Sequence, residues 1–253
     1  MSQEKKQHLV LKNAPIVEAL LDIRIEKFAD ATDAPYSEFA ESVKTEYPTV
    51  APRKQFEGKF EVQSNGEPSV VQPVLLSNGF SYASADNLRV LQARQDGYSF
   101  SQLKPYKDWV TLREEAKKYW LLYKQFIKPS RVERIVLRYI NRIEIPFPIN
   151  DFNEYFLTWI DIAPRLPQGI SGLFFRVVIP HRELPDSIAA TVISTFEPPS
   201  DDKINFIFDI EVVAQLSDAQ SEDDIWALFE TIRKFKDDIF FESMTEKALE
   251  LFK

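Results

Sequence analysis

Residues 131–148 read RVERIVLRYINRIEIPFP, and this stretch decides the fold that we predict. Apolar and polar side chains alternate along it, which is typical of a strand with one face on a core. Three arginines lie on the polar face, although the chain carries a net charge of -8. We expect the apolar face to line the core and the polar face to be a binding surface. The apolar face comprises Ile135, Leu137, Tyr139, Asn141, Ile143 and Ile145, and the polar face comprises Arg134, Val136, Arg138, Ile140, Arg142 and Glu144.

Composition favours a globular protein of a reducing compartment. The 253 residues are 44% hydrophobic, which suits one large domain or two small ones that share a core. The absence of Cys excludes disulfides and thiolate metal sites. The N-terminal residues lack the apolar core of a signal peptide, and no apolar run approaches the roughly 20 residues that span a bilayer. We therefore predict a cytoplasmic protein without membrane contacts.

Charge and residue usage exclude several function classes. An acidic chain with a pI near 5.0 disfavours nucleic acid, because phosphate backbones require a basic face. The chain has six Gly and 16 Pro, and its sequence contains no Gly-rich motif of the kind that binds nucleotides. His8 and His181 are the only histidines, so the sequence disfavours a zinc hydrolase site or a histidine-based triad. We predict no cofactor and no resident metal.

The first half of the chain reads as a strand, a short helix, several short strands and a long helix. Turn residues that favour positive φ separate the short strands, at Ser64-Asn65-Gly66, Ser77-Asn78-Gly79 and Asp96-Gly97. Pro129 ends the long helix, whose aromatic side chains recur at helical spacing. The predicted strands are 16–26, 56–63, 69–76, 80–83, 88–94 and 98–101, and the predicted helices are 36–46 and 107–127.

The second half repeats this order. The strand 132–145 precedes a helix predicted at 152–160, and Ser221 with Asp224 forms a capping box that starts the last long helix. Thr245 is expected to cap a short terminal helix. The remaining predicted strands are 173–180, 188–196 and 203–213, and the last long helix should turn Ile225, Leu228, Phe229, Ile232, Phe235 and Ile239 inward.

The shared order predicts an α+β fold with a duplicated antiparallel sheet. Two halves, 1–130 and 131–253, would share one continuous sheet and core, with both long helices on one face. This arrangement is similar to TATA-binding-protein-like and helix-grip folds. The analogy concerns shape alone, because fold does not determine function.

Four blocks of sequence carry a family resemblance over nearly the whole chain. They are Ala14-Pro15-Ile16-Val17-Glu18-Ala19, then Leu103, Pro105, Tyr106 and Trp109, then Leu137-Arg138-Tyr139-Ile140-Asn141-Arg142-Ile143, and Phe208-Asp209-Ile210-Glu211-Val212. With these blocks the chain resembles a sporadically distributed family of uncharacterised bacterial proteins. The resemblance implies an accessory protein of the kind carried for defence or stress, with no assigned activity and no catalytic residues to transfer.

The arginines allow two interpretations. Arg138 and Arg142 lie roughly 13 Å apart at about 3.3 Å per residue, too far to hold one small phosphate together. They either pair across strands with Asp209 and Glu211, which share one face of the strand 203–213, or they bind an anion or a protein partner. The acidic pair alone is also compatible with a hydrated divalent metal or with acid–base chemistry, but no further acid converges on it.

Asn141 is the polar exception on the apolar face, so we expect its amide to bind backbone or Tyr139, or else to face a ligand. Arg176 and His181 flank a later strand and would add to a polar rim, although a surface or loop position for His181 is favoured. These residues complete the candidate site, which consists of Arg134, Arg138, Arg142, Asn141, Asp209 and Glu211.

Two functions follow from this site. The favoured one is a non-catalytic binding protein that recognises a protein or an anionic ligand through the arginine-bearing sheet face. The alternative is a carrier or enzyme in which Arg138, Arg142, Asp209 and Glu211 line a cavity under the long helices and act on a phosphorylated or carboxylated metabolite. Homodimerisation is compatible with either function, because an uncovered sheet face or edge is otherwise a liability.

Overall fold

The computed structural model describes residues 11–26, 34–57, 60–62, 68–70, 74–198 and 202–253. Its helices are α1 (Ala34–Val43), α2 (Trp109–Ile127), α3 (Glu222–Ser243) and α4 (Glu246–Glu250), with a 3-10 helix η1 (Phe152–Glu154). Its strands are β1 (Ile16–Ile25), β2 (Thr49–Glu57), β3 (Phe60–Val62), β4 (Pro68–Val70), β5 (Val74–Ala83), β6 (Arg89–Arg94), β7 (Gly97–Leu103), β8 (Val132–Pro146), β9 (Phe174–Pro180), β10 (Ile188–Phe196) and β11 (Lys203–Gln215).

Nine of these strands form one antiparallel sheet, which confirms the predicted α+β class. The strand order is β2-β5-β6-β7-β1-β8-β11-β10-β9, and β3 pairs with β4 in a two-stranded sheet. In the described part of the chain, no helix is long and apolar enough to cross a membrane.

The chain divides into two compact units. Unit 1 consists of Arg134–Lys253 with Leu103–Lys107 and the residues up to Leu21, and unit 2 consists of Asp22–Gln102 and Asp108–Glu133. These boundaries differ from the two predicted halves, because the first part of β1 belongs with the C-terminal strands. The division at residue 130 and the duplication stay predictions.

Local sequence determines where the long helices begin and end. The Asp108 side chain accepts from the Thr111 N–H and caps α2, which ends at Lys128 in the left-handed conformation before Pro129. Ser221 and Asp224 form the predicted capping box of α3. Thr245 caps α4 by accepting from the Ala248 N–H, as predicted. Polar caps of this kind contribute roughly 1 kcal/mol each.

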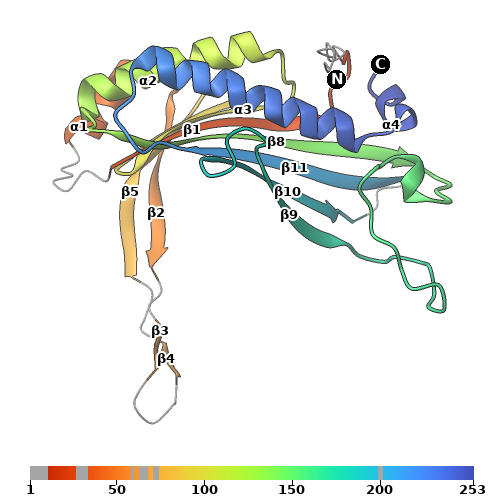
Figure 1. Ribbon diagram of the computed structural model, residues 1–253. Helices are drawn as coiled ribbons and strands as arrows, with labels where there is room; N and C mark the ends of the chain where they lie inside the picture. Colours follow the sequence, from red (N-terminus) through yellow and green to blue (C-terminus); the bar gives the residue numbers. More distant parts are fainter. Residues whose placement is uncertain (1–10, 27–33, 58–59, 63–67, 71–73, 199–201) are drawn as a thin grey trace. The chain divides into compact units, whose positions relative to one another are not determined.

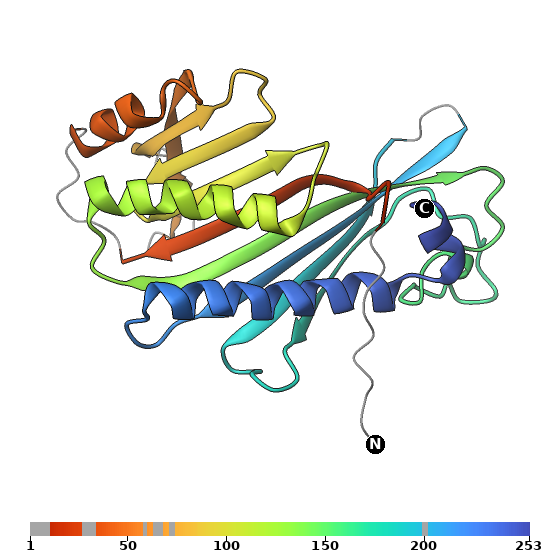
Figure 2. The ribbon, with the colours of Figure 1, turned by 90° about the horizontal axis from the view of Figure 1, so that it is seen from above.

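Aromatic side chains fill the core of unit 2. Figure 2 shows α1 and α2 lying over β5, β6 and β7. Trp120 stacks on Tyr123 of the same helix, and both rings meet Tyr98 of β7. The Tyr98 hydroxyl donates to the Ala116 carbonyl at 3.1 Å, which satisfies its polar atom inside the core. The predicted aromatic face of α2 is therefore a core face.

In unit 1, α3 lies along one face of the strands (Figure 1). The predicted apolar face of β8 is buried against it, Asn141 included, and Phe206 and Phe208 of β11 contribute to the same core. Phe208 packs on Phe240 of α3 with ring centroids 6.4 Å apart. The helix and the inward-facing side chains of the strands thus form one apolar layer.

Three local predictions are wrong or fall outside the structure. Ser77-Asn78-Gly79 lies inside β5 and is not a hairpin turn. Between the pairs Pro52–Phe80 and Lys54–Ser77, the two β5 residues Asn78 and Gly79 correspond to the single β2 residue Arg53, and Gly79 has φ +91, so this site is an irregularity of the ladder. The helix predicted at 152–160 is only the 3-10 turn η1, which Asp151 caps. Ser64-Asn65-Gly66 lies outside the described residues. The Asp96-Gly97 turn is confirmed, since Arg94 pairs with Gly97.

Candidate partner-binding surface

The strands of unit 1 have one face that α3 does not cover. Because side chains alternate along a strand, the register of β8, β11, β10 and β9 places four residues of each strand on this face. We call it the open face. It consists of Val136, Arg138, Ile140 and Arg142 of β8, Ile207, Asp209, Glu211 and Val213 of β11, Ala189, Thr191, Ile193 and Thr195 of β10, and Phe174, Arg176, Val178 and Pro180 of β9.

Arg138 forms a bidentate ion pair with Asp209 on the open face. Its Nε donates to Oδ1 at 2.9 Å, and its Nη2 donates to Oδ2 at 2.6 Å. The Asp209 side chain is 9% exposed and that of Arg138 is 38% exposed, so the guanidinium covers the carboxylate. The hydrogen bond to Asp209 raises the pKa of Arg138 above its ordinary value despite partial burial. One predicted cross-strand pair is thus present.

The other arginine that we expected to pair with these acids takes a different partner. Arg142 Nε lies 2.8 Å from Glu197 Oε2, at the end of β10. Glu144 accepts from Lys203 at 2.8 Å, a hydrogen bond that lowers the pKa of the Glu144 carboxyl. Glu197 was absent from the predicted site, because its approach to Arg142 depends on the register of β10 and β11, which sequence does not reveal.

The remaining predicted residues are divided between two faces. Glu211 is half-buried directly opposite Arg138 in the β8–β11 ladder, and Arg134 is exposed opposite Gln215. Asn141 lies on the other face, 2% exposed, where its Nδ2 donates to the Phe208 carbonyl at 2.9 Å and weakly to that of Tyr139. The amide therefore binds backbone, as expected, and does not join the arginines.

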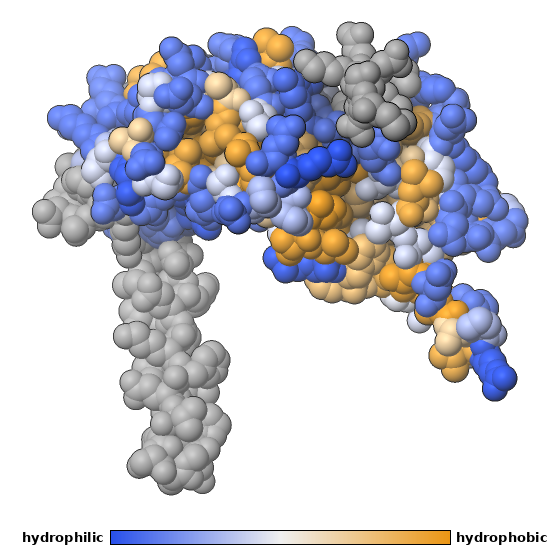
Figure 3. Space-filling model, in the orientation of Figure 1, coloured by the Kyte–Doolittle hydropathy of each residue, from blue (hydrophilic) through white to orange (hydrophobic). Residues whose placement is uncertain are grey.

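Apolar side chains are exposed along β9, beside the paired charges. The exposed fractions are 70% for Phe174, 49% for Val178 and 38% for Val177. Figure 3 shows apolar residues gathered where β9 and β10 lie in unit 1. Exposed apolar side chains near one edge of a sheet are typical of an interaction surface.

His181 follows β9 and has a local role. Its Nδ1 accepts from the N–H groups of Glu183 and Leu184, each at 3.2 Å, and its ring meets the edge of Phe235 at 4.9 Å. Arg176 donates to the Thr191 hydroxyl at 3.3 Å. The loop position favoured for His181 is confirmed.

Unit 2 contains an ionic network that the predicted site missed. Arg94 is 1% exposed, and its guanidinium donates to Asp22 at 2.6 Å, to Asp96 at 3.0 Å and to Ser99 at 3.2 Å. Arg24 bridges the same two acids. Burial raises the pKa of Asp96, but the charges of Arg94 and Arg24 outweigh burial and lower it below its ordinary value. Each guanidinium nitrogen of Arg94 has a partner, so this network stabilises the fold.

Lys236 is a second missed polar group, inside unit 1. It is 8% exposed on the inward face of α3, where its ammonium lies 3.9 Å from the centroid of the Tyr139 ring and pairs with Asp237. Burial lowers the pKa of Lys236 below its ordinary value. The Tyr139 hydroxyl lies 3.0 Å from that of Tyr106. These contacts satisfy the polar groups, and nothing about them requires a substrate.

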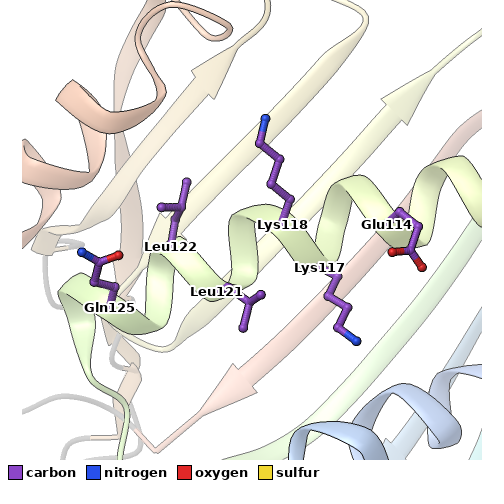
Figure 4. Close-up of a pocket in the computed structure, with 6 residues that line it drawn as sticks. All are labelled: Glu114, Lys117, Lys118, Leu121, Leu122 and Gln125. Atoms are coloured by element: carbon purple, nitrogen blue, oxygen red, sulfur yellow. The ribbon is translucent and has the colours of Figure 1, made fainter.

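A hollow of about 550 Å³ lies on the outer side of α2. Its lining residues all come from this one helix, and Figure 4 shows their side chains spreading to both sides of it. A single helix cannot enclose a ligand, because enclosed sites converge from several elements. The lining residues are Glu114, Lys117, Lys118, Leu121, Leu122 and Gln125.

Neither metal chemistry nor the predicted cavity is supported by this geometry. Among the residues that the structure describes, no group of three or more His, Asp or Glu side chains could hold a metal ion. Arg138, Arg142, Asp209 and Glu211 lie on the face opposite α3 rather than in a space beneath it, because they alternate with residues such as Phe208 that pack on this helix. Comparison with known protein families gave no match, and no curated protein matched the chain.

Proposed function

We propose that this chain is a non-catalytic binding protein that recognises another protein through the open face of unit 1. The observation that carries the proposal is the coexistence of neutralised arginines and exposed apolar side chains. Arg138 and Arg142 are paired with Asp209 and Glu197, so an anion would have to displace an internal carboxylate to bind them. Exposed apolar area gains free energy from burial against a partner at roughly 25 cal/mol per Å².

The charge of this surface also suits a protein partner. The chain has 31 basic and 39 acidic residues, whereas the described residues on or beside the open face carry basic and acidic side chains in nearly equal numbers. Nearly balanced charges, several of them mutually paired, give specificity without strong selection for one small ion. They include Arg134, Arg138, Arg142, Arg176 and Lys203 against Glu18, Glu144, Glu197, Asp209 and Glu211.

The order of elements supports the duplicated architecture as a further part of the proposal. A strand, a short helical segment, antiparallel strands and a long helix occur as β1 to α2 and again as β8 to α3. A TATA-binding-protein-like or helix-grip arrangement is consistent with this order. Cytoplasmic residence, a bacterial source and a role in defence or stress rest on the sequence alone, on its lack of Cys and on the resemblance of its four blocks.

A surface variant with a matched control tests the proposal. Thr191 lies in the middle of the open face, so Thr191→Arg places a bulky charge there while leaving the core unchanged. Leu121→Arg adds the same side chain on the outer side of α2, where Leu121 is 47% exposed. We expect the wild type and Leu121→Arg to capture the same protein from the native host in similar amounts. The amount captured by Thr191→Arg should be at least tenfold lower, as measured by quantitative mass spectrometry.

Two results would contradict the proposal. Equal capture by Thr191→Arg and the wild type, with both melting at the same temperature, would show that the open face is not the binding surface. A small anion retained by the purified protein in native mass spectra and lost from Arg138→Ala/Arg142→Ala would instead support the carrier or enzyme.

A further inference from the structure

Strand β9 ends the sheet, and in the described part of the chain no strand pairs with its outer edge. The His181 N–H donates to the Ile188 carbonyl at 2.8 Å, which fixes the phase of the β9–β10 ladder. In an antiparallel ladder, alternate residues point their N–H and C=O groups toward the neighbouring strand. Phe175, Val177 and Ile179 therefore bond to β10, whereas Phe174, Arg176 and Val178 direct both groups away from it. This edge is a template for another strand.

Both faces of β9 carry apolar side chains that are incompletely covered. Phe175, Val177 and Ile179 are on the side of α3 but remain partly exposed, with Val177 at 38%. Phe174 and Val178 are exposed on the open face. A strand with free edge groups and apolar side chains on both faces requires a partner that supplies hydrogen bonds and apolar area together.

The sequence of β9 is suited to pairing with itself. In an antiparallel register centred on Val177, Arg176 lies opposite Val178 of the partner subunit, and Phe174 lies opposite Pro180 of the partner subunit. The Phe174 N–H meets the partner's Pro180 carbonyl, so the missing N–H of proline costs one hydrogen bond at each end of the ladder. This register also separates the two Arg176 side chains, because like charges directly opposite each other destabilise a ladder.

We propose that two copies of this chain associate through antiparallel pairing of β9 about a two-fold axis at Val177. On the α3 side the register forms a continuous apolar row, in which Val177 meets the partner's Val177 and Phe175 meets the partner's Ile179. Such an isologous interface is the commonest kind in homodimers. The dimer joins the two open faces edge to edge. It stands apart from the proposed function, since the edge can pair whether or not the open face binds a protein.

The absence of Cys makes the register directly testable. In the proposed ladder, Val177 and the partner's Val177 form a non-hydrogen-bonded pair with Cα atoms about 4.5 Å apart, within the range of about 4.4–6.8 Å that a disulfide bridges. Val177→Cys should therefore form a covalent dimer under mild oxidation at about 100 µM protein. Phe175→Cys and Ile179→Cys should each stay largely monomeric, whereas the double variant Phe175→Cys/Ile179→Cys should cross-link.

The control for random collision is Ile193→Cys, on β10 away from the edge. We expect at least tenfold more covalent dimer from Val177→Cys than from Ile193→Cys or from either single variant at 175 and 179. Similar yields from all of them, or a higher yield from Phe175→Cys than from Val177→Cys, would overturn the proposed register.

A proline variant tests the association without cross-linking. Val178→Pro removes an outward N–H and leaves the bonds to β10 intact, whereas Val178→Ala keeps that N–H. Sedimentation at about 100 µM should give twice the 29.4 kDa chain mass for the wild type and Val178→Ala, and the single mass for Val178→Pro, with all three showing the same circular dichroism. A monomeric wild type, or a folded Val178→Pro that stays dimeric, would overturn the proposal. The probe is the chain itself, so these results do not depend on any partner protein.

Discussion

Each unit has arginine–carboxylate pairs on the sheet, but the two sets differ in burial. In unit 2, Arg94 is 1% exposed and holds Asp22 and Asp96 in a network that includes Arg24. In unit 1, the side chain of Arg138 is 38% exposed above Asp209. The same residue types therefore stabilise the interior of one unit and form part of an accessible surface on the other.

The difference shows why arginine in an acidic chain is weak evidence of anion binding. A buried guanidinium has to be saturated by internal acceptors, because an unpaired buried charge is strongly destabilising. An exposed guanidinium is hydrated, so its internal ion pair contributes little and can exchange for a partner's contacts. Burial, rather than residue type, distinguishes the structural site from the candidate binding surface.

The largest expected effect is at Arg94. Arg94→Ala removes the buried cation that Asp22 and Asp96 share and leaves them only the partly exposed Arg24. Breaking a buried pair in this way costs about 3–5 kcal/mol. Urea denaturation of the full chain measures the loss. As a control, Arg94→Met combined with Asp22→Leu removes a charge of each sign and should lose less than Arg94→Ala alone. Equal stability of Arg94→Ala and the wild type would mean that the network is not sealed from water.

The fold was more predictable from the sequence than the partners of its charged residues. The alternation of β8 and the caps at Ser221 and Thr245 are local, so they identified a strand and two helices correctly. Ion pairs depend on the register of distant strands. Arg138 pairs with Asp209, one of the two expected acids, but Arg142 pairs with Glu197. No spacing of residues along the chain indicates the second pair.

Lys236 shows a different limit. The inward face predicted for the last long helix includes Phe235, whereas the structure buries Lys236, four residues after Ile232. Lysine is almost never fully buried unless it is paired, so its residue type does not indicate an inward position. The Tyr139 ring and Asp237 compensate the buried charge. A pairwise tertiary contact of this kind leaves no periodic signal.

The next effect in size is pH-dependent and concerns Asp96. Its pKa in the folded state lies below the ordinary value, so its carboxylate contributes stability above the unfolded pKa of about 3.9 and loses it as pH falls through the folded pKa. We expect Asp96→Asn to cost about 1–3 kcal/mol at pH 7, as charged hydrogen bonds do. Thermal melting between pH 3 and pH 7 should show this cost shrinking below pH 4. A cost of Asp96→Asn that stayed constant from pH 7 to pH 3 would show that the carboxylate charge is not what stabilises the network.

The matched variant in unit 1 is Glu197→Gln, whose partner Arg142 is 39% exposed, as is Glu197 itself. We expect a loss of about 1 kcal/mol or less at pH 7, the usual value for a surface pair.

The smallest expected effect is at Arg138. Arg138→Ala uncovers Asp209 to water from the open face, so hydration replaces the lost ion pair and the cost should be about 1 kcal/mol or less in urea denaturation. A loss as large as that of Arg94→Ala would mean that Asp209 stays sealed and that the two units do not differ in this respect. Because the predicted effect on stability is small, Arg138→Ala isolates the surface contribution of this arginine. A large fall in partner capture by a variant that is otherwise as stable as the wild type would then be due to contacts that Arg138 makes with the partner.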